Sequence, residues 1–83
     1  MLVALPADVA LHARPAGQFV KAAMGFKSQL TVAVDGRDAN AKSILQVLAL
    51  GATGGTVLTL RAEGEDAAEA LDALAGCIDR LTE

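Results

Sequence analysis

Residues 29–41 read QLTVAVDGRDANA, and this stretch decides how the chain folds. Apolar side chains alternate with others from residue 30 to residue 34, which is the pattern of a strand with one buried face. The next two residues, Asp35 and Gly36, fit the centre of a type I′ turn, because both accept positive φ. The stretch therefore predicts an antiparallel hairpin whose short second strand lies around residues 37–41.

Two elements are expected before this hairpin. Val3 and Leu5 predict a short first strand. Pro6 places that strand at a sheet edge or ends it early, since proline has no N–H to give to a neighbouring strand. Apolar residues then recur at helical spacing from Pro15, and Gly25 is typical of a residue that ends a helix. A first helix is predicted between these two residues.

Three elements are expected after the hairpin. Residues 43–46, SILQ, match a capping box and predict a short helix to about Leu50, closed by Gly51. Alternation over residues 56–62 predicts a strand. Asp66 is the expected N-cap of a final amphipathic helix. The apolar face of that helix comprises Ala67, Ala70, Leu71, Leu74, Ile78 and Leu81.

The predicted order is strand, helix, strand, strand, helix, strand, helix. We therefore expect an α+β open-faced β-sandwich, in which a four-stranded antiparallel sheet carries three helices on one face. The other face of such a sheet lies toward solvent. At this length, residues 1–83 are expected to form a single domain. The short helix cannot bury all its apolar residues, and we assign Val47 and Leu50 to the core.

The composition excludes several classes of function. The net charge is −3, and the only aromatic residues are two phenylalanines, which gives no basic and aromatic surface for nucleic acid. No apolar run approaches the roughly 20 residues that span a membrane. The N-terminus has no basic segment before its apolar residues, so we expect no signal peptide, no membrane insertion and a cytoplasmic location.

Charge is divided unevenly along the chain. Residues 1–42 hold five basic and three acidic residues, for a sum of +2, whereas residues 43–83 hold two basic and seven acidic residues, for −5. Basic residues flank His12, which favours an acidic or phosphorylated protein partner. The single cysteine, Cys77, cannot form an internal disulfide, and we expect it to pack as a small core residue of the last helix.

The chain has one histidine, His12, in the segment LHARPA at residues 11–16. Pro15 marks a helix start and places His12 just outside the first turn. Backbone N–H groups and the positive end of the helix dipole attract anions there, and Arg14 can bind phosphate oxygens. The expected support for the phosphate is the start of the helix, at Ala13, Pro15 and Ala16. A nucleophilic ring nitrogen beside an anion site predicts a phosphoryl carrier, although a lone histidine is also a common surface residue.

Three segments carry a resemblance to a known family. They are LHARPA at 11–16, KSILQVLALG at 42–51, and GTVLTL at 55–60 followed by AEGED at 62–66. With them, the chain resembles the HPr family, the histidine-containing phosphocarriers of the bacterial phosphoenolpyruvate:sugar phosphotransferase system. The resemblance extends over nearly the whole chain.

The resemblance implies a role for each matching position. His12 would take a phosphoryl group on Nδ1 from phosphorylated enzyme I and pass it to a IIA domain of a sugar permease, and Arg14 would orient and neutralise the phosphate. Ser43 matches a serine on which, in some lineages, a serine kinase/phosphorylase acts. The partner-contact face would comprise Ile44, Leu45, Leu48 and Ala49. A monomeric carrier that is not itself an enzyme, with no cofactor or metal, is implied.

Two departures and three alternatives remain. Ala10 stands where the family usually has a small turn residue, often glycine, and Pro6 replaces the usual strand residue, so the loop before His12 is expected to be stiffer or shifted.

A nitrogen-related regulatory phosphocarrier would share the fold and His12. A non-carrier regulatory α+β domain would hold a free anion at the same helix start. The chain could also be one domain of a longer phosphotransferase.

Overall fold

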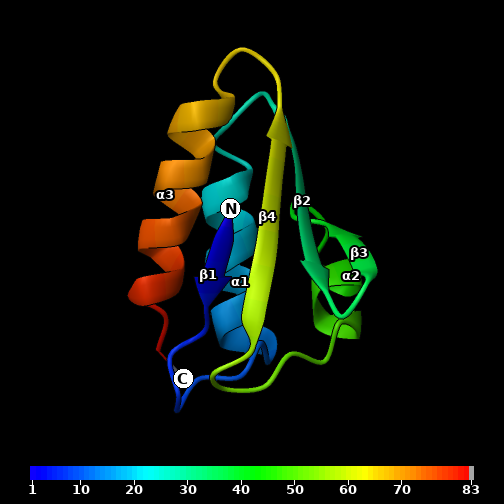
Figure 1. The fold of residues 1–83 in the computed structure, drawn as a ribbon, viewed down its shortest axis with the longest axis vertical. Coiled ribbons are helices and arrows are strands. Elements are labelled where there is room, and N and C mark those ends of the chain that lie inside the picture. The colour runs from blue at the N-terminus through cyan, green and yellow to red at the C-terminus, as the bar shows by residue number, and fades with distance from the viewer. Residues whose placement is uncertain (83) are drawn as a thin grey trace.

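The computed structural model describes residues 1–82, and its elements follow the predicted order (Figure 1). The strands are β1 (Leu2–Ala4), β2 (Gln29–Val34), β3 (Arg37–Asn40) and β4 (Val57–Glu63). The helices are α1 (Ala13–Ala23), α2 (Ile44–Ala49) and α3 (Ala67–Asp79). Each predicted strand and helix is therefore confirmed, with small shifts at the ends.

The four strands form one antiparallel sheet in the order β1-β4-β2-β3. The hairpin between β2 and β3 pairs Val34 with Arg37, and its two turn residues have φ of 51° at Asp35 and 79° at Gly36. Positive φ at both positions defines the predicted type I′ turn. β1 lies at an edge of the sheet and ends at Ala4, two residues before Pro6, as its sequence predicted.

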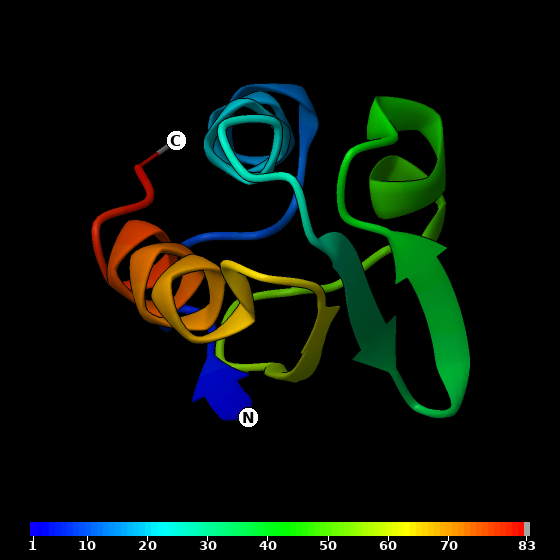
Figure 2. The same ribbon diagram turned by 90° about the horizontal axis from the view of Figure 1, so that it is seen from above.

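All three helices cover the same face of the sheet (Figure 2). α1 packs between α3 and α2, while α3 lies over β1 and β4, and α2 lies beside β3. The apolar side chains of both layers meet in one core. Its largest fully buried members include Phe19, Val32, Val47, Leu58, Leu60, Leu74 and Ile78. The open-faced sandwich is confirmed.

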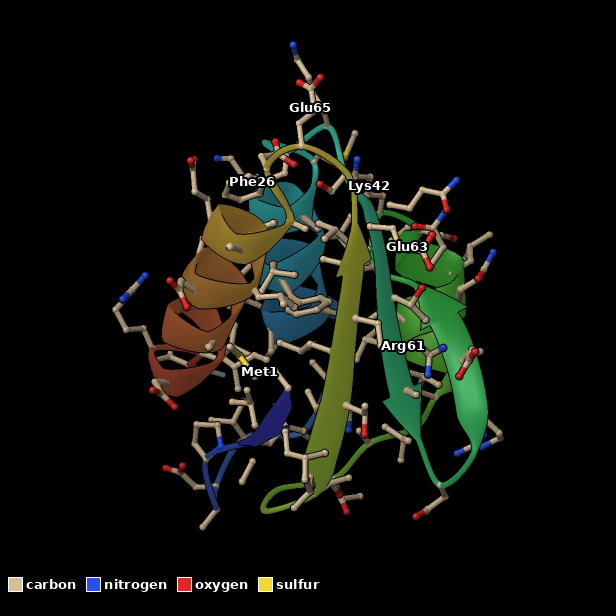
Figure 3. The ribbon with its side chains drawn as sticks, turned by 45° about the horizontal axis from the view of Figure 1, so that its top comes forward. Met1, Phe26, Lys42, Arg61, Glu63 and Glu65 are labelled. Carbon is tan, nitrogen blue, oxygen red and sulfur yellow. The ribbon has the colours of Figure 1, made fainter. Side chains whose placement is uncertain are left out.

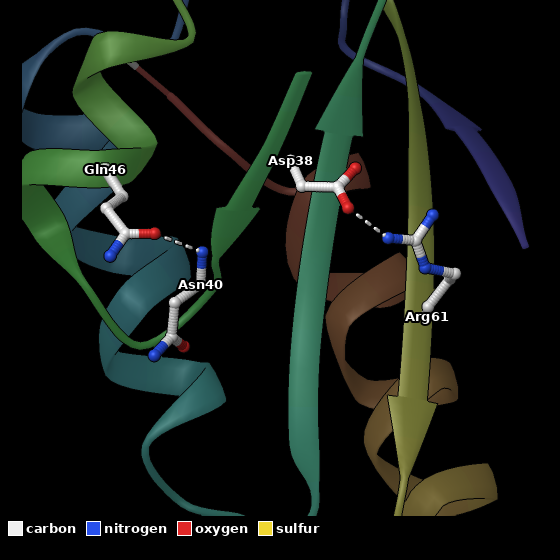
Figure 4. A network of polar contacts seen from close by, with 4 residues as sticks. All are labelled: Asp38, Asn40, Gln46 and Arg61. Carbon is white, nitrogen blue, oxygen red and sulfur yellow. Dashed lines mark hydrogen bonds and ion pairs between the residues drawn. The ribbon is translucent and has the colours of Figure 1, made fainter. Parts of the chain in front are cut away.

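The opposite face of the sheet carries polar side chains in solvent. Arg61 on β4 and Asp38 on β3 reach across β2 and form an ion pair of 2.6 Å (Figure 4). Both side chains are more than half exposed, so the pair contributes at most about 1 kcal/mol to stability. Over residues 1–82, none of the helices combines the length and the apolar character that a membrane span requires.

Asp66 is the N-cap residue of α3, as expected, but its side chain makes no capping hydrogen bond. Its carboxylate instead accepts hydrogen bonds from the backbone N–H groups of Lys27 and Ser28 and from the Ser28 hydroxyl. These donors, first the Ser28 hydroxyl and then the Lys27 N–H, lower the pKa of Asp66 from 3.8 to about 2. The carboxylate therefore holds the loop before β2 against the start of α3.

The capping box of α2 is only half formed. Ser43 is the N-cap, and its Oγ accepts the Gln46 N–H at 3.3 Å. The Gln46 side chain does not return to Ser43, because its Oε1 accepts the backbone N–H of Asn40 at 2.8 Å (Figure 4). The Ser43 N–H donates to the carbonyl of Asn40 instead. The helix end is thus tied to β3, which a local sequence pattern could not predict.

Candidate phosphoryl-transfer site

His12 is the N-cap residue of α1, with extended backbone at φ −80° and ψ −175°. Its carbonyl accepts the Ala16 N–H at 2.9 Å, which begins the helix, and its own N–H donates to Ala10 O at 2.8 Å. The imidazole makes no capping hydrogen bond and is exposed. The helix starts at Ala13, two residues before the predicted start at Pro15, so His12 stands directly at the helix mouth.

The surroundings of His12 are positively polarised. Arg14 is the second residue of α1 and is exposed, and the first turn of the helix contains no acidic residue. Pro15 has no N–H, and the Ala16 N–H already donates to His12. Pro15 and Ala16 are both buried and pack the first turn against the core. Ala13 and Arg14 are the exposed residues at the start of the helix.

The loop that carries His12, residues 5–12, is held by the loop that leads into β4, residues 50–56. Three backbone hydrogen bonds join the two loops: Leu5 N–H to Thr56 O at 2.9 Å, Gly55 N–H to Pro6 O at 3.3 Å, and Leu11 N–H to Ala52 O at 2.9 Å. Figure 1 shows both loops at the end of the molecule where α1 begins. The position of His12 therefore depends on a segment about 40 residues away in the sequence.

The α2 helix presents an apolar face to solvent. Leu45 is 77% exposed and Ile44 is 38% exposed, Ala49 is exposed, and Leu48 is half-buried against the core. Val47 and Leu50, in contrast, are buried, which confirms their assignment to the core. An apolar face that the fold leaves uncovered is typical of a surface that meets a partner.

Two residues that sequence reasoning missed fix this helix in place. The Arg37 guanidinium donates to the carbonyls of Leu50 at 2.7 Å and Ala49 at 3.5 Å, at the C-terminal end of α2. At the other end, the Asn40 N–H donates to Gln46 Oε1 and the Asn40 carbonyl accepts the Ser43 N–H. A cation at a helix C-terminus is a general pattern, but nothing local shows that a residue of β3 supplies it.

The structure does not bring Ser43 close to His12. Lys42, just before α2, donates from Nζ to the carbonyl of Phe26, just after α1, at 2.6 Å. Figure 3 shows Phe26 and Lys42 at one end of the molecule, and α1 begins at the other end. The two helices therefore run in opposite directions, and Ser43 stands beside the C-terminal end of α1.

We also searched residues 1–82 for a metal site and for a reactive cysteine. No group of three or more His, Cys, Asp or Glu residues there is placed to hold a metal ion. Cys77 is partly buried against the core, as predicted, and its Sγ lies 3.8 Å from Gln18 O. Burial raises the pKa of the Cys77 thiol, which makes its thiolate less available.

The arrangement fits reversible nucleophilic chemistry on an exposed surface. The imidazole is open to a second protein, and its neighbours favour an anion next to the ring. Because the side chain is exposed, a group attached to it stays accessible for removal. A carrier needs that property more than it needs tight binding.

Comparison with known proteins agrees with this geometry. Residues 3–80 match the family model described as the PTS HPr component phosphorylation site. The chain is 44% identical over 79 residues to the phosphocarrier protein HPr of Vibrio cholerae serotype O1, covering 95% of this chain and 93% of that protein.

Solved structures agree as well. A crystal structure of HPr from Thermoanaerobacter tengcongensis superimposes with a TM-score of 0.91 at 42% identity, covering 95% of this chain and 89% of that one. A structure of an HPr dimer from the same organism gives 0.78 at 48% identity, covering 83% and 79%. The chain therefore belongs to the HPr family, the phosphocarrier proteins of the phosphotransferase system.

Proposed function

We propose that His12 is the phosphoryl-accepting residue of this chain. It takes the group from phosphorylated enzyme I and donates it to the IIA domains of sugar permeases. The observation that carries the proposal is the placement of the only histidine, exposed at the N-terminus of α1 beside Arg14. In this role the chain is a cytoplasmic, monomeric carrier that is consumed and regenerated with each transfer, and not a stand-alone catalyst.

The transfer exchanges one nitrogen–phosphorus bond for another. The lone pair of His12 Nδ1 attacks phosphorus, and the bond from phosphorus to the donor histidine of enzyme I breaks. The phosphoryl group then lies beside the start of α1, where Ala13 and Arg14 supply the outermost N–H groups and Arg14 also brings its guanidinium. The second transfer repeats these steps with His12 as the leaving group.

The interactions available to a phosphoryl group on His12 are weak enough for a carrier. A helix dipole at an exposed end is worth about 0.3–1 kcal/mol, and a hydrogen bond to a charged group about 1.5–3 kcal/mol. Together they stabilise the phosphoryl group without holding it firmly. The partners would supply the remaining stabilisation of the transition state by positioning the reacting groups.

We also propose that the apolar face of α2 contacts enzyme I. Ile44, Leu45, Leu48 and Ala49 are the residues in question. Ser43 begins this face, and a phosphate on its hydroxyl would place negative charge where an apolar contact forms. Regulation by a serine kinase/phosphorylase would then act through docking, because Lys42, next to Ser43, bonds to Phe26 beyond the C-terminal end of α1, whereas His12 lies at its N-terminal end.

Incubation with phosphoenolpyruvate and enzyme I tests the proposal. Intact mass should rise by one phosphoryl group that acid removes, and addition of a IIA domain should return the parent mass. His12→Ala should keep the fold, since the side chain is exposed, and should gain no mass. An acid-labile phosphate on His12→Ala would contradict the assignment. Acceptance by only a nitrogen-type IIA domain would favour the regulatory branch.

A further inference from the structure

Gly54 lies directly against the backbone of the loop that leads to His12. A Cβ at position 54 would be 2.2 Å from Ala7 O, 2.8 Å from Ala7 C and 3.3 Å from Pro6 O. Cβ atoms in proteins do not approach other heavy atoms within 3.0 Å. The opposing atoms are backbone and cannot turn aside as the end of a side chain would. Only glycine allows loops 5–12 and 50–56 to touch as they do.

This contact lies within the set of hydrogen bonds that joins the two loops. Gly55, the next residue, donates to Pro6 O, and Ala52, two residues earlier, accepts from Leu11. A Cβ on residue 54 would have to move at least 1.2 Å farther from Ala7 O to reach an ordinary contact distance of 3.4 Å, which would force the loops apart. Both hydrogen bonds would have to lengthen or rearrange.

The backbone that a Cβ on residue 54 would displace lies only a few residues before His12 in the sequence. Ala7 and Pro6 stand five and six residues before it, and Ala7 is exposed. The residues between include Val9 and Leu11, whose side chains are buried in the core. The His12 N–H donates to Ala10 O in the same segment. Leu11, the residue directly before His12, donates its N–H to Ala52 O, so a shift of loop 50–56 acts on the backbone next to the imidazole.

We propose that Gly54 is a positioning residue for phosphoryl transfer at His12. The missing side chain lets loop 50–56 act as a template for loop 5–12, and so fixes where His12 Nδ1 stands relative to the start of α1. This role rests on the proposed function of His12. Gly54 itself touches neither the phosphoryl group nor the imidazole in this account.

Gly54→Ala tests the proposal by rapid-quench measurement of transfer from phosphorylated enzyme I. At saturating carrier, the rate constant should fall by about tenfold to a hundredfold, since misplacement by 1 Å can cost this much. The dissociation constant for enzyme I should stay within about twofold, because the proposed contact face on α2 is held separately by Arg37 and Asn40. The ring resonances of His12, the only histidine, should shift in NMR spectra.

Gly25→Ala is the matched control. A Cβ there would be 3.4 Å from Ala22 O, an ordinary contact, and the residue lies beyond the C-terminal end of α1. Its transfer rate should equal that of the parent. A double variant, Gly54→Ala with Ala7→Gly, should recover part of the rate, because glycine at position 7 lets that peptide turn its carbonyl away. If Gly54→Ala alone does not fold, the double variant is compared with Ala7→Gly.

These measurements distinguish a failure of the proposed function of His12 from a failure of the positioning role of Gly54. If the parent and Gly25→Ala are not phosphorylated on His12, the proposed function fails. If they are phosphorylated and Gly54→Ala transfers at the parental rate with unchanged ring resonances, the positioning role fails. A loss that appears only in the dissociation constant for enzyme I would also overturn it, because Gly54 would then act on docking.

Discussion

At the scale of single residues, the proposed site depends on two side chains at the start of one helix. In this proposal His12 provides the nitrogen and Arg14 the charge, and both stand in a six-residue segment whose helix start could be predicted locally to within two residues. Residues that support the site from a distance were not predictable in this way. Arg37, Asn40 and Gly54 each contact a residue brought near by the fold, and their own sequence surroundings are ordinary.

Arg14→Ala should leave His12 able to accept phosphate but slow both transfers. Loss of a charge-assisted hydrogen bond worth about 1.5–3 kcal/mol corresponds to a factor of about 10 to 100 in rate. Rapid-quench kinetics for the enzyme I step and the IIA step measure it. Arg14→Lys is the control. Its transfer rates should lie between those of the parent and those of Arg14→Ala, since lysine keeps the charge but loses the forked geometry. Parental rates at both steps would remove Arg14 from the site.

Asp66→Asn should lower the melting temperature at pH 7, and this loss should shrink in acid. The folded pKa of Asp66, about 2, lies below its ordinary value of 3.8, so the unfolded chain binds the proton more readily. The stabilisation is therefore complete above about pH 4 and disappears as the pH falls toward 2. Thermal melts from pH 2 to 7 check this. A melting difference that does not change with pH would contradict it, and Asp72→Asn, on the exposed side of α3, controls for charge alone.

At the scale of elements, the hairpin and the two long helices follow from local pattern, whereas α2 does not stand alone. Its six residues are too few for a helix that is stable without tertiary support. β3 holds it at both ends through Arg37 and Asn40, and Val47 anchors it in the core. The sequence indicated where α2 begins, but the attachment of its two ends depends on the sheet.

Leu45→Ala and Val47→Ala should separate docking from folding on this one helix. Leu45 is mostly exposed, so its truncation should change stability by no more than about 0.5 kcal/mol and should weaken binding of enzyme I. Val47 is fully buried, so its truncation should cost about 2 kcal/mol. Denaturant unfolding and titration calorimetry measure the pair. Unchanged affinity in Leu45→Ala would show that the partner binds elsewhere.

Ser43→Asp should melt no lower than the parent and still accept phosphate more slowly. Aspartate is a good N-cap and adds negative charge at the favourable end of α2, worth up to about 1 kcal/mol. The same charge stands beside Ile44 and Leu45, where contact with a partner would desolvate it. Ser43→Ala is the control: it should lose about 1 kcal/mol of stability and transfer normally. A lower melting point in Ser43→Asp would refute the capping argument, and normal affinity would refute the docking face.

At the scale of the whole molecule, the sheet determines where the proposed site lies, although no side chain of the sheet belongs to that site. The antiparallel order brings loops 5–12 and 50–56 to one end, where their hydrogen bonds hold His12 at the mouth of α1. Alternation and turn residues were enough to predict the sheet and the helical layer. The crossing of these loops could not be predicted, because it depends on the register of β1 against β4 and on the missing side chain of Gly54.

NMR of the chain carrying ¹⁵N-labelled histidine tests the central claim most directly. With one histidine, every imidazole signal belongs to His12. After reaction with phosphoenolpyruvate and enzyme I, a single phosphorus should couple to Nδ1 of that ring, and the coupling should vanish when a IIA domain is added. An unchanged imidazole in a chain whose mass has risen by one phosphoryl group would contradict the account, because the phosphate would then lie on another residue.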